Sequence, residues 1–595
     1  MKSLNRDNQK RLINPLHQIK ELWKYFTPAR KRSYFFLVLL MIAAAIAELV
    51  SIGAILPFLA VLTSPESITS LPYIGQYLYF DNTNDLVLLA TIVFASAAVM
   101  SGIVRLFLLR HLTNLSFRTG TEIATLAYSK ALNRPYQSHV LSNSSELIST
   151  ITGKTHSAIF TTLIPCLTII SSIFILSIIS SALIFFDPVI ALSAILVIGL
   201  TYSVVSIFSR RKLVQGSMVI AKKNDEVIRI LQESLGGIRE IIIDNTHNLY
   251  VKSFKDIDYE FRMAQSSRTI IGQSPRYWME AIGMVLIAAF SYYLAMTSES
   301  FTSVVPILGT IALAAQRMLP VMQLAYASWA NIQSGSYSIE DILDILKEDN
   351  MLAAEDDIEN SFLFQKEITL NDVNFYYQDS KEPTLKNINL TINKGQKIGI
   401  VGETGSGKST LMDIMMGLLV PSSGSIYIDS KEINKSNMKL WQSNISHVSQ
   451  SIFLIDASVN ENIAFGVSSN EIDNDLISSA SKSSESYDFI SKMQDGFDSK
   501  VGERGTQLSG GQLQRIGIAR ALYKRKEVLF FDEATSALDL MTEDKIMNNI
   551  YDYEDSITMV MIAHRIETLK NCDFIIEMHD GEIKSIVSYN DLKSR

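Results

Sequence analysis

A glycine-rich segment in the C-terminal half of the chain has the residue types and spacing to hold phosphate groups. Residues 402–409 read Gly-Glu-Thr-Gly-Ser-Gly-Lys-Ser, directly after a strand-like run at 397–401 and before a helix-like run. Glycines let backbone N–H groups turn toward anionic oxygens, and a helix N-terminus adds a favourable dipole. The pattern predicts that Lys408 reaches the terminal phosphates and that the Ser409 hydroxyl binds Mg²⁺. The predicted nucleoside triphosphate site comprises Gly402, Glu403, Thr404, Gly405, Ser406, Gly407, Lys408, Ser409 and Thr410.

Two adjacent carboxylates follow a second apolar run. Residues 528–531 read Val-Leu-Phe-Phe, and Asp532 and Glu533 come next. A carboxylate at the end of a buried strand near a phosphate loop is suited to hold the metal ion, which is the role predicted for Asp532. Glu533 is placed to polarise the attacking water as a general base. An isolated Asp-Glu pair after a strand is often a solvated turn, but the phosphate loop favours the catalytic interpretation.

A third motif narrows the class of protein. Residues 508–512 read Leu-Ser-Gly-Gly-Gln and are followed by a helix-like run at 514–522. The C-terminal third thereby resembles the ATPase domains of the ABC family. The resemblance implies that Ser509, Gly510, Gly511 and Gln512 of one domain complete the ATP site of another domain. Because this chain carries one such domain, the resemblance implies a half-transporter that pairs with a second copy, with ATP and Mg²⁺ as cofactors.

Further positions match the family in chain order. Tyr377 matches the aromatic residue that stacks on adenine, although the neighbouring Tyr376 leaves the register open. Gln450 matches the glutamine that senses Mg²⁺, and His564 matches the histidine that binds the γ-phosphate. The resemblance therefore implies Glu533, His564 and Gln450 as catalytic residues. It implies Ser409, Gln450 and Asp532 as the residues around the metal.

The composition of the N-terminal half predicts a helical membrane bundle. Of the 595 residues, 47% are hydrophobic and 19% are charged, below the ~25% usual for soluble chains. The net charge of −8 argues against nucleic acid as a partner. The two cysteines, Cys166 and Cys572, lie in different halves of the chain and predict no disulfide. Runs long enough to span a bilayer occupy residues 34–62, 86–109, 158–184, 188–208, 277–296 and 302–330.

Lysine and arginine set the expected orientation of these six spans. They are frequent in the first 32 residues and in the long polar segments 110–157 and 209–276, and absent from 63–85 and 297–301. By the positive-inside rule, the termini and both polar segments are cytoplasmic. The long segments are expected to be helical extensions outside the bilayer. Coupling helices to the ATPase domain are expected near 135–143 and 235–239.

Three arginines lie within or close to the predicted spans. A charge at the centre of a bilayer costs about 2.5–3.5 kcal/mol, so such residues usually face a cavity or a partner. Arg105, Arg276 and Arg317 fall at similar depth on three helices and together predict a site for an anionic headgroup. Alternatives stay open: Arg105 and Arg276 are close enough to helix ends to snorkel, and Arg276 could pair with Glu280 four residues on.

The membrane half is similar to bacterial lipid-linked oligosaccharide flippases of the PglK type. The similar stretches are residues 48–58 (ELVSIGAILPF), 136–153 (YQSHVLSNSSELISTITG), 274–283 (SPRYWMEAIG) and 312–320 (ALAAQRMLP). The resemblance implies that the arginines bind the pyrophosphate that joins polyprenol to sugar. It implies an ATP-driven flippase of the bacterial inner membrane that works as a homodimer and carries such a lipid from the inner to the outer leaflet.

The expected organisation is a transmembrane domain at 1–340, a linker at 341–365 and an ABC nucleotide-binding domain at 366–595. The fold class is an α-helical membrane bundle plus an α/β P-loop ATPase domain. A multidrug, lipid or peptide exporter is the alternative function, and Phe160, Trp278 and Tyr326 are available for an apolar cavity. A non-transporting, ATP-gated channel is an alternative from another class, and six spans exclude a soluble ABC ATPase.

Overall fold

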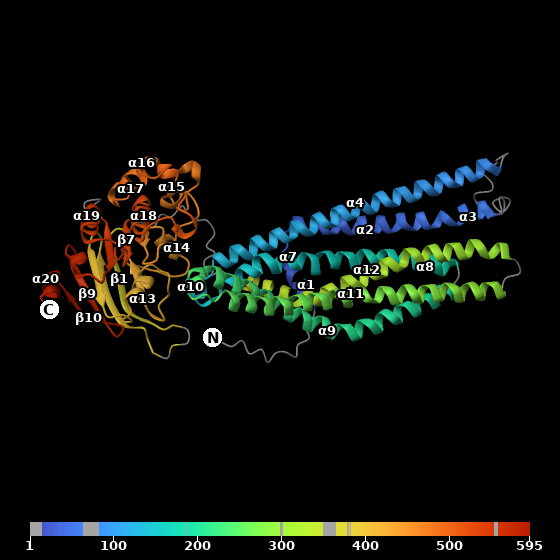
Figure 1. Cartoon of the computed structure of the whole chain (residues 1–595), viewed down its shortest axis with the longest axis horizontal. Helices are drawn as coiled ribbons and strands as arrows, with labels where there is room; N and C mark the ends of the chain where they lie inside the picture. The colour runs from blue at the N-terminus through green and yellow to red at the C-terminus, as the bar shows by residue number, and fades with distance from the viewer. Residues whose placement is uncertain are drawn as a thin grey trace. The chain divides into compact units, whose positions relative to one another are not determined.

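The computed structural model describes residues 15–63, 83–186, 188–297, 301–348, 364–377, 380, 382–551 and 557–594. The chain forms two compact units (Figure 1). The helical unit contains residues 7–132 and 142–349, and the ATPase unit contains residues 350–595 together with 1–6 and 133–141. The short helix α5 (Tyr136–Leu141) therefore groups with the ATPase unit. It coincides with the first of the two expected coupling helices.

Each of the six predicted spans is helical in the structure. The helices of this unit are α1 (Pro15–Lys24), α2 (Pro28–Gly53), α3 (Ile55–Thr63), α4 (Thr83–Leu132), α6 (Ser144–Ile148), α7 (Thr155–Ala158), α8 (Ile164–Phe186), α9 (Pro188–Gly236), α10 (Ile238–Ile243), α11 (His247–Thr297) and α12 (Phe301–Lys347). Within the described residues, three helical stretches are long and apolar enough to cross a membrane: Pro28–Leu59, Asn84–Leu132 and Ser144–Phe185. The predicted spans 188–208, 277–296 and 302–330 lie in α9, α11 and α12.

Four of these helices are much longer than a bilayer requires. α4, α9, α11 and α12 contain 50, 49, 51 and 47 residues, whereas about 20 residues cross the hydrocarbon core. At 1.5 Å per residue, 50 residues extend about 75 Å. The polar segments therefore continue the spanning helices, as the sequence predicts. The last part of α12, residues 341–347, lies in the segment expected as linker, so that stretch is helical.

Two of the predicted spans are interrupted. The first changes from α2 to α3 at Ala54. The third, 158–184, contains the π-helical segment Ile159–Leu163 near its start. A second π-helical segment, Ser149–Lys154, precedes this span, and α7 separates the two segments. A π-turn inserts an extra residue and so changes which side chains face the bundle. Apolar periodicity alone did not reveal this shift.

The helical unit buries one side of its helices and exposes apolar residues on the other. Leu37, Met41 and Ala44 of α2 pack in a cluster with residues of α4 and α12. Along α4, Leu88, Ile92 and Val99 are exposed. An exposed apolar helix surface of this kind is suited to contact lipid.

The ATPase unit contains two sheets. The strands are β1 (Glu367–Phe375), β2 (Leu385–Asn393), β3 (Lys397–Gly402), β4 (Ser423–Ile428), β5 (Lys431–Glu432), β6 (Ile445–Val448), β7 (Val528–Asp532), β8 (Thr558–Ile562), β9 (Phe574–His579) and β10 (Glu582–Val587). One sheet is antiparallel in the order β2-β1-β4-β5, and the other has the order β10-β9-β3-β8-β7-β6. In the second sheet β3, β6, β7, β8 and β9 run parallel and only β10 is antiparallel.

The parallel strands position the predicted site. β8 lies between β3 and β7, and most residues of these three strands are buried, as expected for a parallel sheet covered on both faces. Because parallel strands end at the same edge, the loops after β3, β7 and β8 come together there. These loops carry the glycine-rich segment, the Asp532–Glu533 pair and His564.

Candidate ATP site

The glycine-rich loop has a backbone that side chains would disrupt. Gly402, Gly405 and Gly407 have φ values of 154°, 87° and 97°, which glycine adopts without the strain other residues would incur. A Cβ on Gly402 would lie 2.3 Å from the Met578 carbonyl oxygen, whereas a Cβ on Gly405 would meet nothing within 4 Å. The loop therefore packs closely against the sheet at Gly402, whereas it faces open space at Gly405. α13 (Lys408–Met415) starts directly after it.

The polar groups of the loop fit a phosphate ligand with Mg²⁺. The Ser406 hydroxyl is buried and has no hydrogen-bond partner among the described residues, although buried polar groups are nearly always paired. The Lys408 ammonium is also buried and donates to the Gly402 and Glu403 carbonyl oxygens at 2.8 Å each. A triphosphate would supply stronger acceptors to both groups.

The metal ion would need ligands from the nucleotide. Among the described residues, no cluster of three or more His, Cys, Asp or Glu side chains is suited to hold a metal. Mg²⁺ in nucleotide sites takes one or two protein oxygens and completes its shell with phosphate and water. Ser409 and Asp532 have the oxygen chemistry for this role.

The three predicted catalytic residues are joined by hydrogen bonds. Glu533 Oε2 accepts a hydrogen bond from the Gln450 amide at 2.6 Å, and Glu533 Oε1 lies 2.6 Å from His564 Nε2. Glu533 itself has a left-handed backbone (φ 49°), and its N–H donates to the Ile562 carbonyl oxygen at 3.1 Å. A non-glycine residue in this conformation is costly and is characteristic of functional sites. The loops after β6, β7 and β8 therefore meet at the Glu533 carboxylate.

Acidic groups are concentrated beneath the loop. Burial, and then the neighbouring Glu533 carboxylate, raise the pKa of Asp532, which Lys408 partly offsets. Burial, and then the Asp532 carboxylate, raise the pKa of Asp413 to about 6. Asp413 lies on α13 and did not stand out in the sequence. A cation at this position would relieve the repulsion between the carboxylates.

Tyr377 contacts α13, the helix that follows the phosphate loop. Its hydroxyl lies 3.2 Å from the Thr410 hydroxyl, and its ring meets Phe375 edge-on with centroids 5.0 Å apart. The backbone N–H of Tyr376 instead donates to the Ser422 hydroxyl. Both rings are about two-fifths exposed. The contact with Thr410 favours Tyr377 as the residue that stacks on the base.

The Leu-Ser-Gly-Gly-Gln motif forms the start of a helix. Ser509 caps α18 (Gly510–Tyr523): its hydroxyl accepts from the Gln512 N–H, and the Gln512 side chain accepts from the Ser509 N–H. This capping box fixes the first turn and leaves the Ser509 hydroxyl at its end. A Cβ on Gly511 would lie 3.3 Å from the Ala537 carbonyl oxygen, so glycine allows the close approach of the loop after β7. In the described residues, no hydrogen bond joins Ser509 or Gln512 to the phosphate loop of the same chain.

A buried carboxylate that the sequence did not single out fixes the catalytic loops. Glu543 of α19 (Leu540–Tyr551) accepts hydrogen bonds from Thr535 (2.8 Å), Thr568 (2.6 Å) and Arg565 (2.7 Å). Thr535 follows Glu533 by two residues, and Arg565 follows His564. Glu543 therefore connects the two loops that carry the predicted catalytic residues Glu533 and His564. In the sequence, the position of Arg565 directly after His564 was the one signal that pointed to this network.

The membrane arginines are all paired with carboxylates. Arg276 donates to Glu280 at 2.8 Å on the same helix, the alternative that its spacing allowed. Arg105 and Arg317 both contact Glu48, at 3.4 Å each, and Ser101 donates to the same carboxylate at 2.8 Å. The structure therefore brings Arg105 and Arg317 together and leaves Arg276 in a separate pair.

Comparisons with known proteins agree with this geometry. Residues 385–536 match the family model described as ABC transporter. A solved structure, a bacterial Atm1-family ABC exporter with ATP bound, has a TM-score of 0.79 and 20% identity, and covers 95% of this chain and 96% of that one. The fold is therefore that of an ABC exporter: a helical transmembrane part followed by an α/β ABC ATPase domain.

Curated relatives match parts of the chain. The leukotoxin export ATP-binding protein LtxB of Aggregatibacter actinomycetemcomitans is 38% identical over 273 residues, 46% of this chain and 38% of that protein. The alpha-hemolysin translocation ATP-binding protein HlyB of Escherichia coli O157:H7 is 36% identical over 285 residues, which are 48% of this chain and 39% of that protein. The ATP-dependent lipid A-core flippase of Francisella novicida is 31% identical over 399 residues, and the match covers 63% of this chain and 65% of that protein. The chain thus spans about two-fifths of the toxin exporters it matches and 65% of the flippase.

Proposed function

We propose that two copies of this chain form an ATP-driven flippase that moves a polyprenyl-pyrophosphate-linked oligosaccharide from the inner to the outer leaflet of a bacterial inner membrane. The observation that carries the choice of substrate is the cluster of Arg105 and Arg317 around Glu48. It lies in the helical unit and joins α2, α4 and α12.

The charge balance of this cluster favours an anionic ligand. Two guanidinium groups share one carboxylate, so the three side chains carry a net charge of about +1. Glu48 is only 4% exposed, whereas Arg105 and Arg317 are each 41% exposed. Charge in a membrane interior is costly unless a partner neutralises it. A pyrophosphate would supply that partner, since the planar guanidinium fork matches phosphate oxygens.

The ATPase unit supplies the energy in this proposal. ATP and Mg²⁺ bind at the glycine-rich loop, with Lys408 on the phosphates and with Ser409 and Asp532 near the metal. The signature residues Ser509, Gly510, Gly511 and Gln512 of the partner copy close the site from the other side. Glu533 then accepts a proton from the attacking water, while Gln450 and His564 hold its carboxylate in place.

The relatives support a lipid cargo over a protein cargo. The lipid A-core flippase matches 63% of this chain, so the match reaches beyond the ATPase domain into the membrane half. The toxin translocators match 46% and 48% of it. Export of a protein, or of a drug or ordinary lipid, is the alternative function.

The test is flipping of a polyprenyl-pyrophosphate oligosaccharide in proteoliposomes. We expect the wild type to flip the lipid with ATP and Arg317→Ala to lose flipping at least tenfold, since it removes a charge-assisted contact. Arg262→Ala is the matched control, because Arg262 is exposed and pairs with Asp258 outside the cluster. ATP hydrolysis, measured in parallel, checks that the ATPase unit is folded. Wild-type flipping by Arg317→Ala would contradict the proposed substrate site.

A further inference from the structure

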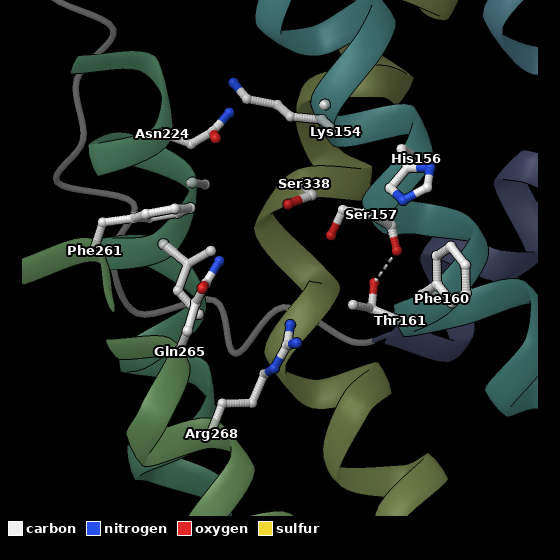
Figure 2. Close-up of a pocket in the computed structure, with 13 residues that line it drawn as sticks. Lys154, His156, Ser157, Phe160, Thr161, Asn224, Phe261, Gln265, Arg268 and Ser338 are labelled. Carbon is white, nitrogen blue, oxygen red and sulfur yellow. Dashed lines mark hydrogen bonds between the residues drawn. The ribbon is translucent and has the colours of Figure 1, made fainter. Parts of the chain in front are cut away.

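A cavity of about 310 Å³ lies within the helical unit, away from the Arg105–Glu48–Arg317 cluster (Figure 2). Its walls come from the interrupted helix before α8, from α9, from α11 and from the end of α12. This volume is within the range of small-molecule sites. Since residues 209–276 are expected on the cytoplasmic side, a ligand would enter from the cytosol or from the inner leaflet.

Arg268 of α11 points into this cavity without an anionic partner (Figure 2). In the described part of the chain, no carboxylate and no hydrogen-bond acceptor pairs with its guanidinium. By contrast, Lys223 of α9 is paired with Glu226 and Glu260. Burial lowers the pKa of Arg268, but an arginine side chain stays charged at any physiological pH. The cavity therefore contains a half-buried positive charge with which no group of the described chain forms an ion pair or a hydrogen bond.

The other cation of the cavity, Lys154, faces two carboxylates, so its end of the cavity carries no free positive charge. Lys154 is buried and contacts Asp225 at 2.9 Å and Asp341 at 2.6 Å. Figure 2 places Lys154 and Arg268 at opposite ends of the cavity. An anionic group would consequently be attracted to the Arg268 end and not to the Lys154 end.

The groups near Arg268 have the chemistry to hold an amphipathic anion. Gln265 lies one turn before Arg268 on α11, and its side-chain amide makes no hydrogen bond among the described residues. Thr161 is already engaged, since its hydroxyl donates to the Ser157 carbonyl oxygen at 2.9 Å. Phe261 and Phe160 line opposite walls and provide apolar surface (Figure 2).

We propose that this cavity binds an organic anion, whose phosphate or carboxylate group pairs with Arg268 and Gln265 and whose apolar part contacts Phe160 and Phe261. The planar guanidinium fork binds either oxyanion bidentately. Such a ligand comes from one of two sources, an anionic lipid or a water-soluble organic phosphate. The site is separate from the proposed substrate cluster and is tested without ATP, so its failure leaves the proposed function untouched.

Binding is measured on the full chain in phosphatidylcholine nanodiscs, whose lipid carries no net charge. The probes are lysophosphatidic acid and glycerol 3-phosphate, and the readouts are native mass spectrometry and the shift in unfolding midpoint. A ligand that binds only the folded state raises this midpoint. We expect at least one probe to bind the wild type, and Arg268→Gln to weaken that binding about tenfold or more. If only lysophosphatidic acid binds, the natural ligand is a lipid. If glycerol 3-phosphate binds, the natural ligand is a soluble organic phosphate.

Two controls keep the proposal falsifiable. Arg262→Gln removes a cation from the same helix that lies outside the cavity, and it is expected to bind like the wild type. Lysophosphatidylcholine has the same acyl chain with a capped phosphate, and its binding is expected not to depend on Arg268. The proposal is overturned if neither probe binds the wild type, or if Arg268→Gln and Arg262→Gln bind equally.

Discussion

At the scale of single residues, the Glu533 carboxylate is the centre of the candidate ATP site. Gln450 and His564 hold its two oxygens at 2.6 Å each, and its own backbone is left-handed. A carboxylate held by two neighbours from different loops is pre-positioned for proton transfer, and its position depends on both loops being in place. The strained backbone is consistent with a residue retained for chemistry and not for packing.

Glu533→Gln is expected to lower the rate of ATP hydrolysis at least about 100-fold, because an amide does not accept the proton of the attacking water. ATP binding is expected to persist, since the phosphate loop is unchanged. Phosphate release and retention of labelled ATP measure the two effects. Glu567→Gln, an exposed change shortly after His564, is expected to hydrolyse ATP at the wild-type rate. Normal turnover by Glu533→Gln would refute the general-base role.

The sequence predicted these residues because each sits in a short contiguous motif. The glycines, Lys408 and the Asp532–Glu533 pair are recognisable without any tertiary information. The electrostatic effect of Asp532 on Asp413 was not predictable in this way, since it depends on how α13 packs beside β3 and β8. The same is true of Glu543, whose three partners come from two other loops.

At the scale of elements, a buried lysine joins three helical segments of the helical unit. Lys154 ends a π-helical segment and contacts Asp225 of α9 and Asp341 of α12. Asp225 also accepts from the Ser149 hydroxyl at 2.7 Å. The lysine is 2% exposed, whereas the aspartates are 27% and 35% exposed. The network therefore fixes the interrupted helix against its neighbours.

Lys154→Met is expected to destabilise the helical unit by about 2 kcal/mol. This value is below the 3–5 kcal/mol for a fully buried pair, because water reaches both aspartates. The midpoint of thermal unfolding in nanodiscs measures the change. Lys222→Met is the matched control: Lys222 is 61% exposed and lies 3.9 Å from Glu226, so its loss is expected to have little effect. Equal shifts for the two variants would mean that the network adds no stability.

Apolar runs were sufficient to locate the helices, but not their interruptions. All six predicted spans lie on helical chain because each contains about 20 apolar residues. The break at Ala54 and the π-turns around α7 were not predictable, since they depend on tertiary contacts such as those of Lys154. Residues 341–347 were assigned to a linker because they are acidic, yet they continue α12, where Ile342, Leu343 and Leu346 are buried.

At the scale of the whole molecule, the proposed dimer pairs the signature motif of one copy with the phosphate loop of the other. In the described residues of one copy, Ser509 and Gln512 are hydrogen-bonded only within their own helix. A two-fold symmetric dimer would place each signature opposite the partner's phosphate loop and so form two equivalent sites.

Mixed dimers with two different affinity tags test this arrangement. Lys408→Ala disables a phosphate loop, and Ser509→Arg disables a signature. With Lys408→Ala on one copy and Ser509→Arg on the other, shared sites leave one site intact, so about half of the wild-type hydrolysis is expected. With both substitutions on one copy and a wild-type partner, both shared sites are damaged and hydrolysis is expected to be lost. If each site were complete within a single chain, the results would be reversed. The first dimer would have no intact site, and in the second dimer the wild-type partner would keep its own site.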